Sequence, residues 1–417
     1  MSSIHELMLP SLLALALSAP ASAAPTAAVR SPEAASILVG ASLPLSGSEA
    51  NTGQAFQEGY QLAVEQVNVR GGLVVGEKQV PITLRIADDQ SNPLLAAKLT
   101  ESMASVQRVD FMLGSYSGLL SDPQSTIAER EKIPYVFGGA AAQLHEHGYR
   151  YAFGLLSPLK LLANAFESWL TEEQVAGTLP TPAKVAMAWE DTARGREYHT
   201  VLAAALARSK GHYQIVSEQS FPLNTKDAAG IVEKLKAAGA DLFLADAHVG
   251  DFVNIHREYV KAGLCHKVVS YGARGAEQQA SDALGAANVA NLVSGVWWDE
   301  QLAADGLNKQ FAATFRARFQ HAPDWRHALS YETARVLFVA IEQAGSKDRE
   351  AVRATLASLR IPSIVPGGQL SFPAAYGQQA HFPFLLLQNR PNRPSAIIYP
   401  GYLATAKPTA PGSGCQL

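Results

Sequence analysis

The chain has 417 residues, of which 47% are hydrophobic and 17% are charged, and its formal net charge is −3. This length exceeds that of one small domain, so two lobes are expected. A nearly balanced charge argues against a broad nucleic-acid-binding face, which needs an excess of Lys and Arg to neutralise phosphates. We therefore predict no nucleic-acid partner.

The N-terminus has the features of a secretory signal peptide over residues 1–24. Its apolar run, Leu7–Leu17, is too short to span a bilayer, and Ala21–Ala23 reads "ASA", the small-x-small form of a cleavage site. The residues before this run lack Lys and Arg, which is atypical, and a buried core helix is the alternative. A spacer follows at 25–35. We predict export to the periplasm without a lipid anchor, because no Cys follows the apolar run directly.

Predicted strands and helices alternate through the first part of the chain. Short apolar runs predict strands, and apolar residues at helical spacing, ended by signals such as Gly71–Gly72, predict the helices between them. This strand–helix repeat is typical of a parallel, doubly wound sheet. The predicted strands are Ile37–Leu43, Val80–Asp89, Val109–Leu113 and Ile133–Gly139.

The same strand–helix pattern restarts in the second part, with predicted strands at "AKVAMAWED", "YQIVSEQSF", "DLFLADA" and "KVVSYGARG". Asn224 or Thr225 is expected to cap the helix after the second of these strands. Helices around Leu307–Phe319 and Ser330–Ala344 have no strands between them and should cover the first lobe. A hairpin of "FPFLLLQ" and "SAIIYP" should close the second lobe.

The predicted fold class is α/β, with two doubly wound parallel-sheet lobes joined by a multi-crossing hinge, a clam-shell. In such sheets ligands bind outside the carboxyl ends of the strands, and facing lobes bring both sets of strand ends to one cleft. The predicted bounds are 36–154 and 298–362 for lobe 1, 155–297 and 363–402 for lobe 2, and 403–417 for a flexible tail.

The predicted strand Val109–Leu113 ends in an open turn, "GSYSG", before a helix at about Leu119–Glu131. The first N–H groups of a helix are free, and with the positive end of the helix dipole they form an anion site without a charged side chain. Small residues let an anion approach the backbone closely. An ordinary Ser/Gly turn is the alternative.

Five segments together resemble the branched-chain amino-acid-binding (Leu/Ile/Val-binding-like) family of periplasmic substrate-binding proteins of ABC transporters. They read "ASLPLSGSEANTGQAFQEGYQLAVEQVNVRGG", "ADDQSNPLLAAKLTESM", "LGSYSG…AEREKIPYVFGGAAA", "AWEDTARGRE" and "ADLFLADAHVGDFVN", in family order. With a weaker C-terminal part, the resemblance covers roughly Ile37 to Tyr399. It implies the type I periplasmic binding fold, capture of a small molecule by lobe closure and docking on a membrane permease.

The resemblance also implies where the carboxylate of a ligand binds. In the family this group lies at the "GSYSG"-type turn and at the following "GGAAA"-type loop, which correspond to Ser117 and Gly118, with Gly139 and Ala141 opposite. Ser117 can add a hydroxyl donor to the backbone N–H groups.

The sequence departs from the family's amino-acid binders at two positions. Those proteins hold the ligand ammonium with an acidic residue in a "GPEG"-like loop, whereas the matching "YGARGAE" has Arg274, and their first-lobe Thr is Ala141 here. A guanidinium repels an ammonium group but holds a carboxylate by a two-pronged pair. We predict an anionic ligand without an amine: a 2-oxo acid, a dicarboxylate or an aromatic acid. A solvated Arg274, or a match shifted by one residue, is the alternative.

Four further cleft candidates follow from loop matches. Arg194 and His248 would deepen a positive cleft, Thr52 lies in the first loop, and Tyr116 could stack on a ring of the ligand. A plain surface position is the alternative for Arg194 and His248, and inward packing is the alternative for Tyr116.

Cysteine and histidine patterns indicate little further chemistry. Cys265 and Cys415 are the two cysteines, and we expect two free or buried thiols, with one bridge to the C-terminal tail as the alternative. "HEH" at His145–His147 has no further ligands at metal spacing. The sequence has no nucleophile elbow, P-loop or H-E-x-x-H motif. We predict no metal, no cofactor and no enzymatic activity.

The sequence thus predicts a periplasmic solute-binding protein of an ABC importer. Its expected partners are a small anionic ligand and the permease subunits, and a monomer is expected. Two alternatives stay open: a ligand sensor of the same fold that signals to a kinase or chemoreceptor, and an enzyme of unrecognised type in the cleft.

Overall fold

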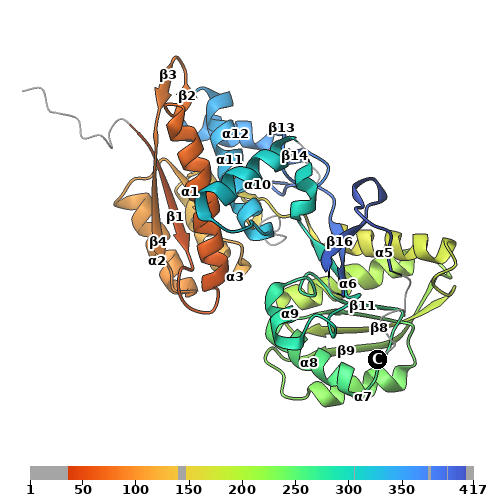
Figure 1. Ribbon diagram of the computed structural model, residues 1–417. Helices are drawn as coiled ribbons and strands as arrows, with labels where there is room; N and C mark the ends of the chain where they lie inside the picture. The colour runs from red at the N-terminus through yellow and green to blue at the C-terminus, as the bar shows by residue number, and fades with distance from the viewer. Residues whose placement is uncertain (1–35, 140–146, 305, 374–376, 392, 410–417) are drawn as a thin grey trace, which may run out of the picture.

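The computed structural model describes residues 36–139, 147–304, 306–373, 377–391 and 393–409, which form two α/β lobes (Figure 1). The predicted signal peptide, Ala141 and Cys415 lie outside these residues. The predicted fold class is confirmed, whereas the exact residue bounds of the lobes stay predictions.

The first lobe is built on a five-stranded sheet in the order β4-β1-β5-β6-β7, in which all neighbouring strands are parallel. Helices cover both faces, because alternate side chains of the buried strands enter two separate apolar clusters. The helices α1 and α11 pack on one face, and α2 and α3 on the other. The elements are β1 (Ile37–Leu43), α1 (Ala50–Val69), β4 (Ile82–Asp88), α2 (Pro93–Ser105), β5 (Phe111–Gly114), α3 (Gly118–Arg130), β6 (Tyr135–Phe137), β7 (Ala152–Gly154) and α11 (Trp325–Ala344).

The second lobe repeats this plan with a four-stranded parallel sheet in the order β11-β10-β8-β9. The helices α5 and α6 cover one face and α7 and α8 the other. The elements are α5 (Leu159–Val175), β8 (Ala183–Glu190), α6 (Ala193–Arg208), β9 (Tyr213–Phe221), α7 (Ala228–Ala238), β10 (Leu242–Asp246), α8 (Val249–Lys261), β11 (Val268–Tyr271) and α9 (Gln278–Leu284).

Smaller elements complete the fold. The predicted C-terminal hairpin is confirmed as β15 and β16, and β12 adds a third antiparallel strand to it. Two short hairpins, β2–β3 and β13–β14, extend the first lobe (Figure 1). The bounds are β2 (Leu73–Val75), β3 (Lys78–Val80), β12 (Val293–Val296), η2 (Glu300–Ala304), α10 (Gly306–Phe319), α12 (Arg349–Ala357), β13 (Arg360–Pro362), β14 (Gln369–Ser371), β15 (Leu385–Arg390), β16 (Arg393–Tyr399) and η4 (Gly401–Leu403).

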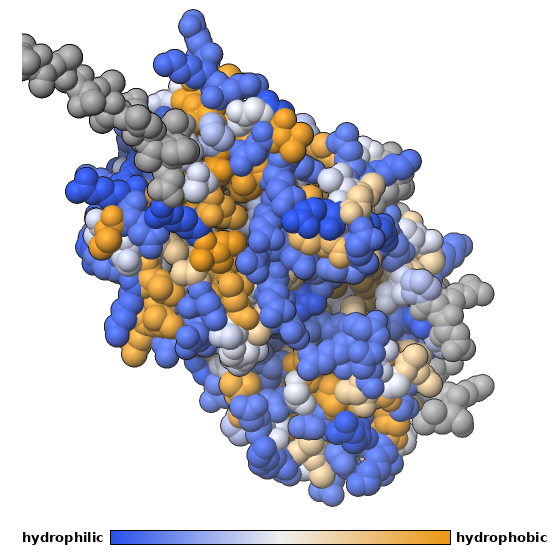
Figure 2. All heavy atoms as spheres, turned by 60° about the vertical axis from the view of Figure 1, so that its left-hand side comes forward, coloured by the Kyte–Doolittle hydropathy of each residue, from blue (hydrophilic) through white to orange (hydrophobic). Residues whose placement is uncertain are grey.

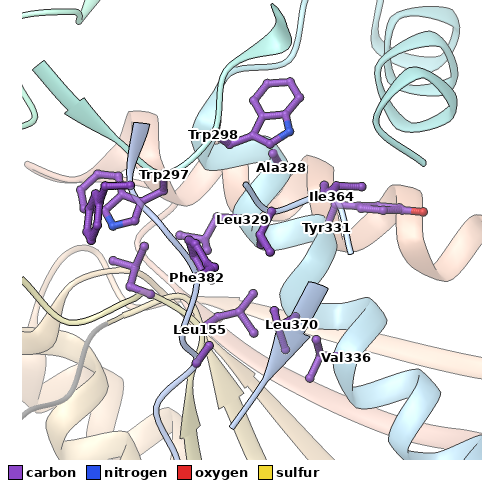
Figure 3. Packing of buried hydrophobic residues seen from close by; sticks show 14 of the residues in the cluster. Leu155, Trp297, Trp298, Ala328, Leu329, Tyr331, Val336, Ile364, Leu370 and Phe382 are labelled. Carbon is purple, nitrogen blue, oxygen red and sulfur yellow. The ribbon is translucent and has the colours of Figure 1, made fainter. Parts of the chain in front are cut away.

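The segments where the chain passes between the lobes pack together. Leu155, Trp297 and Phe382 come from three different passes, and all three are buried in one apolar cluster (Figure 3). The joint between the lobes is therefore a packed core rather than a set of loose linkers.

Two local predictions are wrong. The cap of α7 is Asp227, whose carboxylate accepts the N–H of Gly230, whereas the N–H groups of Asn224 and Thr225 donate to Asp251. The preference for free thiols fails as well, because Cys265 is disulfide-bonded.

The exposed surface is mainly hydrophilic, with hydrophobic side chains gathered chiefly on one lobe in the view of Figure 2. Large exposed apolar side chains of the first lobe include Val69, Leu94, Val106 and Leu119. Within the described ranges, no helix has both the length and the apolar character that crossing a bilayer requires.

Candidate functional site

The turn after β5 brings free backbone donors to the edge of the first sheet. Ser117 is the N-cap of α3, and its side chain makes no cap hydrogen bond. Its carbonyl accepts the N–H groups of Leu120 and Ser121, while the N–H groups of Gly118 and Leu119 have no acceptor among the described residues. Such N–H groups at the positive end of a helix can bind an anion.

Glycine lets the neighbouring loop approach this turn. A Cβ atom on Gly139 would lie 2.9 Å from the Tyr116 carbonyl oxygen and 2.9 Å from the Phe137 ring, whereas one on Gly118 would meet nothing within 4 Å. Gly139 is buried and Gly118 is exposed. The two loops that the resemblance implies are thus adjacent, with Gly139 as the tight contact and Gly118 as the open position.

Tyr116 joins an aromatic group that spans three segments. Its ring centroid lies 5.2 Å from that of Trp325 and 5.9 Å from that of Trp297, and the two indoles are 5.0 Å apart. Trp325 begins α11 and Trp297 follows β12. The Tyr116 hydroxyl and the Trp297 Nε1 are buried and have no hydrogen-bond partner in the described part of the chain. Tyr116 packs inward against protein rings, as the alternative reading of the sequence held.

Charged side chains gather at the carboxyl edge of the second sheet. Asp246 ends β10, Arg194 lies in the first turn of α6 after β8, and Arg274 follows β11. Because β8, β10 and β11 are neighbouring parallel strands, these ends meet at one edge. The Arg194 Nε lies 3.5 Å from the Asp246 Oδ2, and the Arg274 Nη1 lies 2.6 Å from Oε1 of Glu277.

Both guanidinium groups are largely withdrawn from water. The exposed fractions of their side chains are 26% for Arg194 and 15% for Arg274, so Arg274 is not a solvated loop residue. Burial disfavours the charge of Arg274, but Tyr116, Glu277 and Asp246 outweigh it and raise its pKa further.

Two buried polar atoms at this edge lack partners among the described residues. They are the Nη2 of Arg194 and the Oδ1 of Asp246. Gly272 lies beside this oxygen in a left-handed conformation, and a Cβ atom there would be 2.2 Å from it. A small polar ligand can bind where a buried site offers a hydrogen-bond donor and a hydrogen-bond acceptor that have no partner in the protein.

His248 is committed to a neighbouring carboxylate. Its backbone N–H donates to Glu190 Oε1 at 2.6 Å, and its Nδ1 pairs with the other Glu190 oxygen. Burial favours neutral Glu190, but the hydrogen bonds and charge of His248 outweigh it and lower the pKa of Glu190. The His248 side chain is 50% exposed. This histidine therefore anchors a buried acid rather than adding a free positive group to the cleft.

The remaining candidates are less closely connected to this site. Thr52 lies half-buried in the first turn of α1, and no contact between its side chain and the other candidates is recorded in the described ranges. Ala141 lies outside the described residues. The structure thus brings Arg194 and Arg274 to one edge of the second sheet, and it packs Tyr116 against Trp297 and Trp325.

Sequence reasoning missed four members of the site. Asp246 could have been found, since it ends a predicted strand at the ligand-binding edge, and Glu277 follows Arg274 by three residues. Trp325 and Arg326 carried no such signal. Arg326 pairs with Asp324, and its charge also interacts with Arg274 and Glu277 of the other lobe.

Comparisons with known proteins agree with this architecture. A family model described as "Periplasmic binding protein" matches residues 36–390. The curated Leu/Ile/Val-binding protein homolog 7 of Brucella melitensis is 25% identical over 347 residues, covering 79% of this chain and 83% of its own.

Two solved structures illustrate the shared fold. The substrate-binding protein LivJ of Streptococcus pneumoniae, in complex with isoleucine, has a TM-score of 0.72 at 19% identity and covers 90% of this chain and 100% of its own. A solute-binding protein of an ABC transporter from R. palustris, in complex with benzoate, has a TM-score of 0.70 at 19% identity and covers 92% of this chain and 100% of its own. The resemblance to type I periplasmic binding proteins is confirmed, and the chain belongs to the periplasmic binding protein family.

Proposed function

We propose that this protein captures a small carboxylate-bearing molecule between its lobes and delivers it to a membrane permease. A 2-oxo acid, a dicarboxylate or an aromatic acid fits the cleft better than a standard α-amino acid. Closure of the lobes on the ligand shifts an equilibrium between open and closed forms, and the permease recognises the closed form.

The pair of buried guanidinium groups at the second-lobe edge carries this proposal. Arg274 occupies the loop in which the family's amino-acid binders offer an acid, and its side chain is 15% exposed and pairs with Glu277. The Arg194 Nη2 is buried without a recorded partner, and is therefore a donor that a ligand carboxylate can satisfy.

The first lobe supplies the complementary half of the site. The free N–H groups of Gly118 and Leu119 and the hydroxyl of Ser117 offer donors without a counter-charge. A carboxylate held there is stabilised by the dipole of α3, and Tyr116 and Trp325 add apolar surface for a chain or ring.

Asp246 favours a second candidate, an α-amino acid whose ammonium binds the spare Oδ1 of this residue. The names of the curated relatives point the same way. However, an ammonium there would share the carboxylate with Arg194, whose Nε lies 3.5 Å from the other oxygen. Since like charges repel, Arg194 disfavours an ammonium at this position, and we place the ligand carboxylate at the guanidinium groups instead.

A matched pair of ligands separates the two candidates. Leucine and its 2-oxo analogue, 4-methyl-2-oxopentanoate, differ only at the α carbon, which carries an ammonium group in leucine and a carbonyl oxygen in the analogue. Benzoate and succinate extend the series. We expect the acids without an amine to raise the unfolding temperature of the full chain and leucine to leave it unchanged, because a ligand that binds the folded state stabilises it. Mass spectrometry of the acid after hours with the protein should find it intact, whereas turnover would indicate an enzyme.

The variant Asp246→Asn sharpens this test. For an acid ligand without an amine, Asp246→Asn should retain or strengthen the stabilisation, because it removes a negative charge beside the ligand. For an amino-acid ligand, Asp246→Asn should abolish the stabilisation by the ligand. Stabilisation of the parent protein by leucine, lost in Asp246→Asn, would therefore contradict the proposal in favour of the second candidate.

A further inference from the structure

Three potential metal ligands, separate from the residues of the candidate site, converge in the first lobe. They are Glu58 of α1, His321 of the loop between α10 and α11, and His327 in the first turn of α11. One ligand atom from each residue lies within 4.8 Å of the others. Glu58 lies more than 250 residues before the two histidines in the chain, so the fold brings it to them.

Both imidazoles present Nε2 to the same carboxylate oxygen. The Glu58 Oε2 lies 3.1 Å from Nε2 of His321 and 3.2 Å from Nε2 of His327. This oxygen is nevertheless buried and has no hydrogen-bond partner among the residues that the structure describes, so neither nitrogen approaches it in a hydrogen-bonding geometry. In a tetrahedral zinc site the ligand atoms lie about 3.3 Å apart, which matches these two separations.

The outer nitrogens of both rings face oxygen atoms. The Nδ1 of His321 lies 3.1 Å from the carbonyl oxygen of Ala322, and the Nδ1 of His327 lies 2.8 Å from Oδ1 of Asp324. With Nδ1 as the donor, Nε2 carries the lone pair that a metal ion needs, and a carboxylate or carbonyl behind a metal-bound histidine is the usual supporting contact. In the other tautomer of His327, Nδ1 accepts the Asp324 N–H instead.

Apolar packing holds the two rings in place. The Phe315 ring centroid lies 5.3 Å from that of His321 and 4.7 Å from that of His327. His327 is buried, whereas the His321 side chain is 47% exposed and opens the cluster to solvent. An ion can therefore enter from the side of His321.

We propose that Glu58, His321 and His327 bind one divalent first-row transition-metal ion, with zinc as the best match to two imidazoles and one carboxylate. Three protein ligands leave a fourth position for water. The ion would tie α1 to the start of α11, two residues from Trp325 in the aromatic group at the cleft. Its role is structural: it fixes the helix that presents Trp325.

Zinc titration of the full chain tests this site, with any purification tag removed and bound metal stripped by EDTA. We expect one Zn²⁺ per chain by calorimetry and a higher unfolding temperature with Zn²⁺ than without. Glu58→Gln and His321→Gln should each weaken zinc binding on the order of tenfold or more. Neither variant removes the buried His327, so both should fold.

His199→Gln provides the matched control, because His199 pairs with Glu218 at 2.6 Å but belongs to no cluster of three ligands in the described residues. It should bind zinc as the parent does. Substitution of Co²⁺ should give the visible absorption of a four-coordinate ion in the parent and in His199→Gln. Zinc affinity unchanged in Glu58→Gln or His321→Gln, or no zinc binding by the parent, would overturn the proposal.

Discussion

The two lobes meet the cleft with different chemistry. The first lobe offers backbone N–H groups, a hydroxyl and aromatic rings, and its main candidate residues, Ser117 and Gly118, are uncharged. The second lobe offers charged side chains, with Arg194 beside Asp246 and Arg274 beside Glu277. A backbone site recognises the shape and charge of a carboxylate whatever its substituents, whereas paired side chains depend on what else the ligand carries. We infer that ligand class is set mainly by the second lobe.

The largest expected effect comes from removing the charge of the second lobe. Arg274→Gln should weaken binding of a carboxylate probe such as benzoate by about 2–5 kcal/mol. Truncating one member of a buried charge pair leaves the other member, here the carboxylate of the probe, unpaired. Calorimetry measures this loss, and the unfolding temperature without ligand shows whether the lobe itself is weakened by the unpaired Glu277.

Arg196→Gln is the control for this variant. Arg196 lies two residues from Arg194, but its pair with Asp191 is exposed, at 57% and 58%. Exposed ion pairs contribute little free energy, so Arg196→Gln should retain the affinity of the parent protein for the probe. Equal losses in the two variants would indicate a general charge effect and not a site.

A smaller effect is expected from the close approach of backbone in the first lobe. Gly139→Ala should lower the free energy of unfolding by about 1–3 kcal/mol, because the new Cβ overlaps the Phe137 ring and the Tyr116 carbonyl. Gly118→Ala should change it by less than about 0.5 kcal/mol, since its Cβ meets open space. Urea unfolding of both variants measures the difference, and equal losses would show that the two loops are not in contact.

The smallest expected effect is a pH dependence of the free energy of unfolding, which arises from a histidine of the second lobe. Burial lowers the pKa of His256 to about 4, against about 6.5 in an unfolded chain. Between these values the unfolded chain binds a proton that the folded chain does not, so stability falls as pH decreases. From pH 8 to pH 5.5 this group should remove about 1.4 kcal/mol.

His256→Gln should flatten this dependence, because glutamine can donate to the Asn288 carbonyl that the ring now contacts at 2.7 Å but does not titrate. Thermal unfolding of the variant and the parent at the two pH values checks the difference. A parent and variant with parallel pH profiles would mean that His256 is protonated in the folded state.

The sequence predicted the fold closely where structure is local. The strand Ile37–Leu43 is observed with the predicted bounds, and α3 begins at Gly118, one residue before the prediction. Capping was harder. Asn224, Thr225 and Asp227 can all cap a helix, and the choice of Asp227 depends on Asp251, which takes the first two N–H groups from another helix.

Part of the candidate site followed from sequence because strand ends meet at one edge. The loop matches to the family, rather than this rule alone, placed Arg194 and Arg274 among the cleft candidates. The sequence could not reveal that Trp325 lies beside Tyr116, because that contact depends on how α11 packs across the first lobe. Trp325 lies 209 residues further along the chain than Tyr116. The partner of His248 was equally hidden, since nothing in the sequence pairs it with Glu190.

The packing of α11 on α1 has a consequence for the order in which the molecule assembles. Ser330 of α11 donates a hydrogen bond to the carbonyl of Ala55, 275 residues earlier. During synthesis, the N-terminal lobe therefore waits for the last third of the chain before its apolar face is covered, whereas the strands and helices between Leu159 and Val296 emerge as one continuous stretch. Both lobes are thus completed by late segments of the chain, the first by α11 and the second by the β15–β16 hairpin, which pairs with β12.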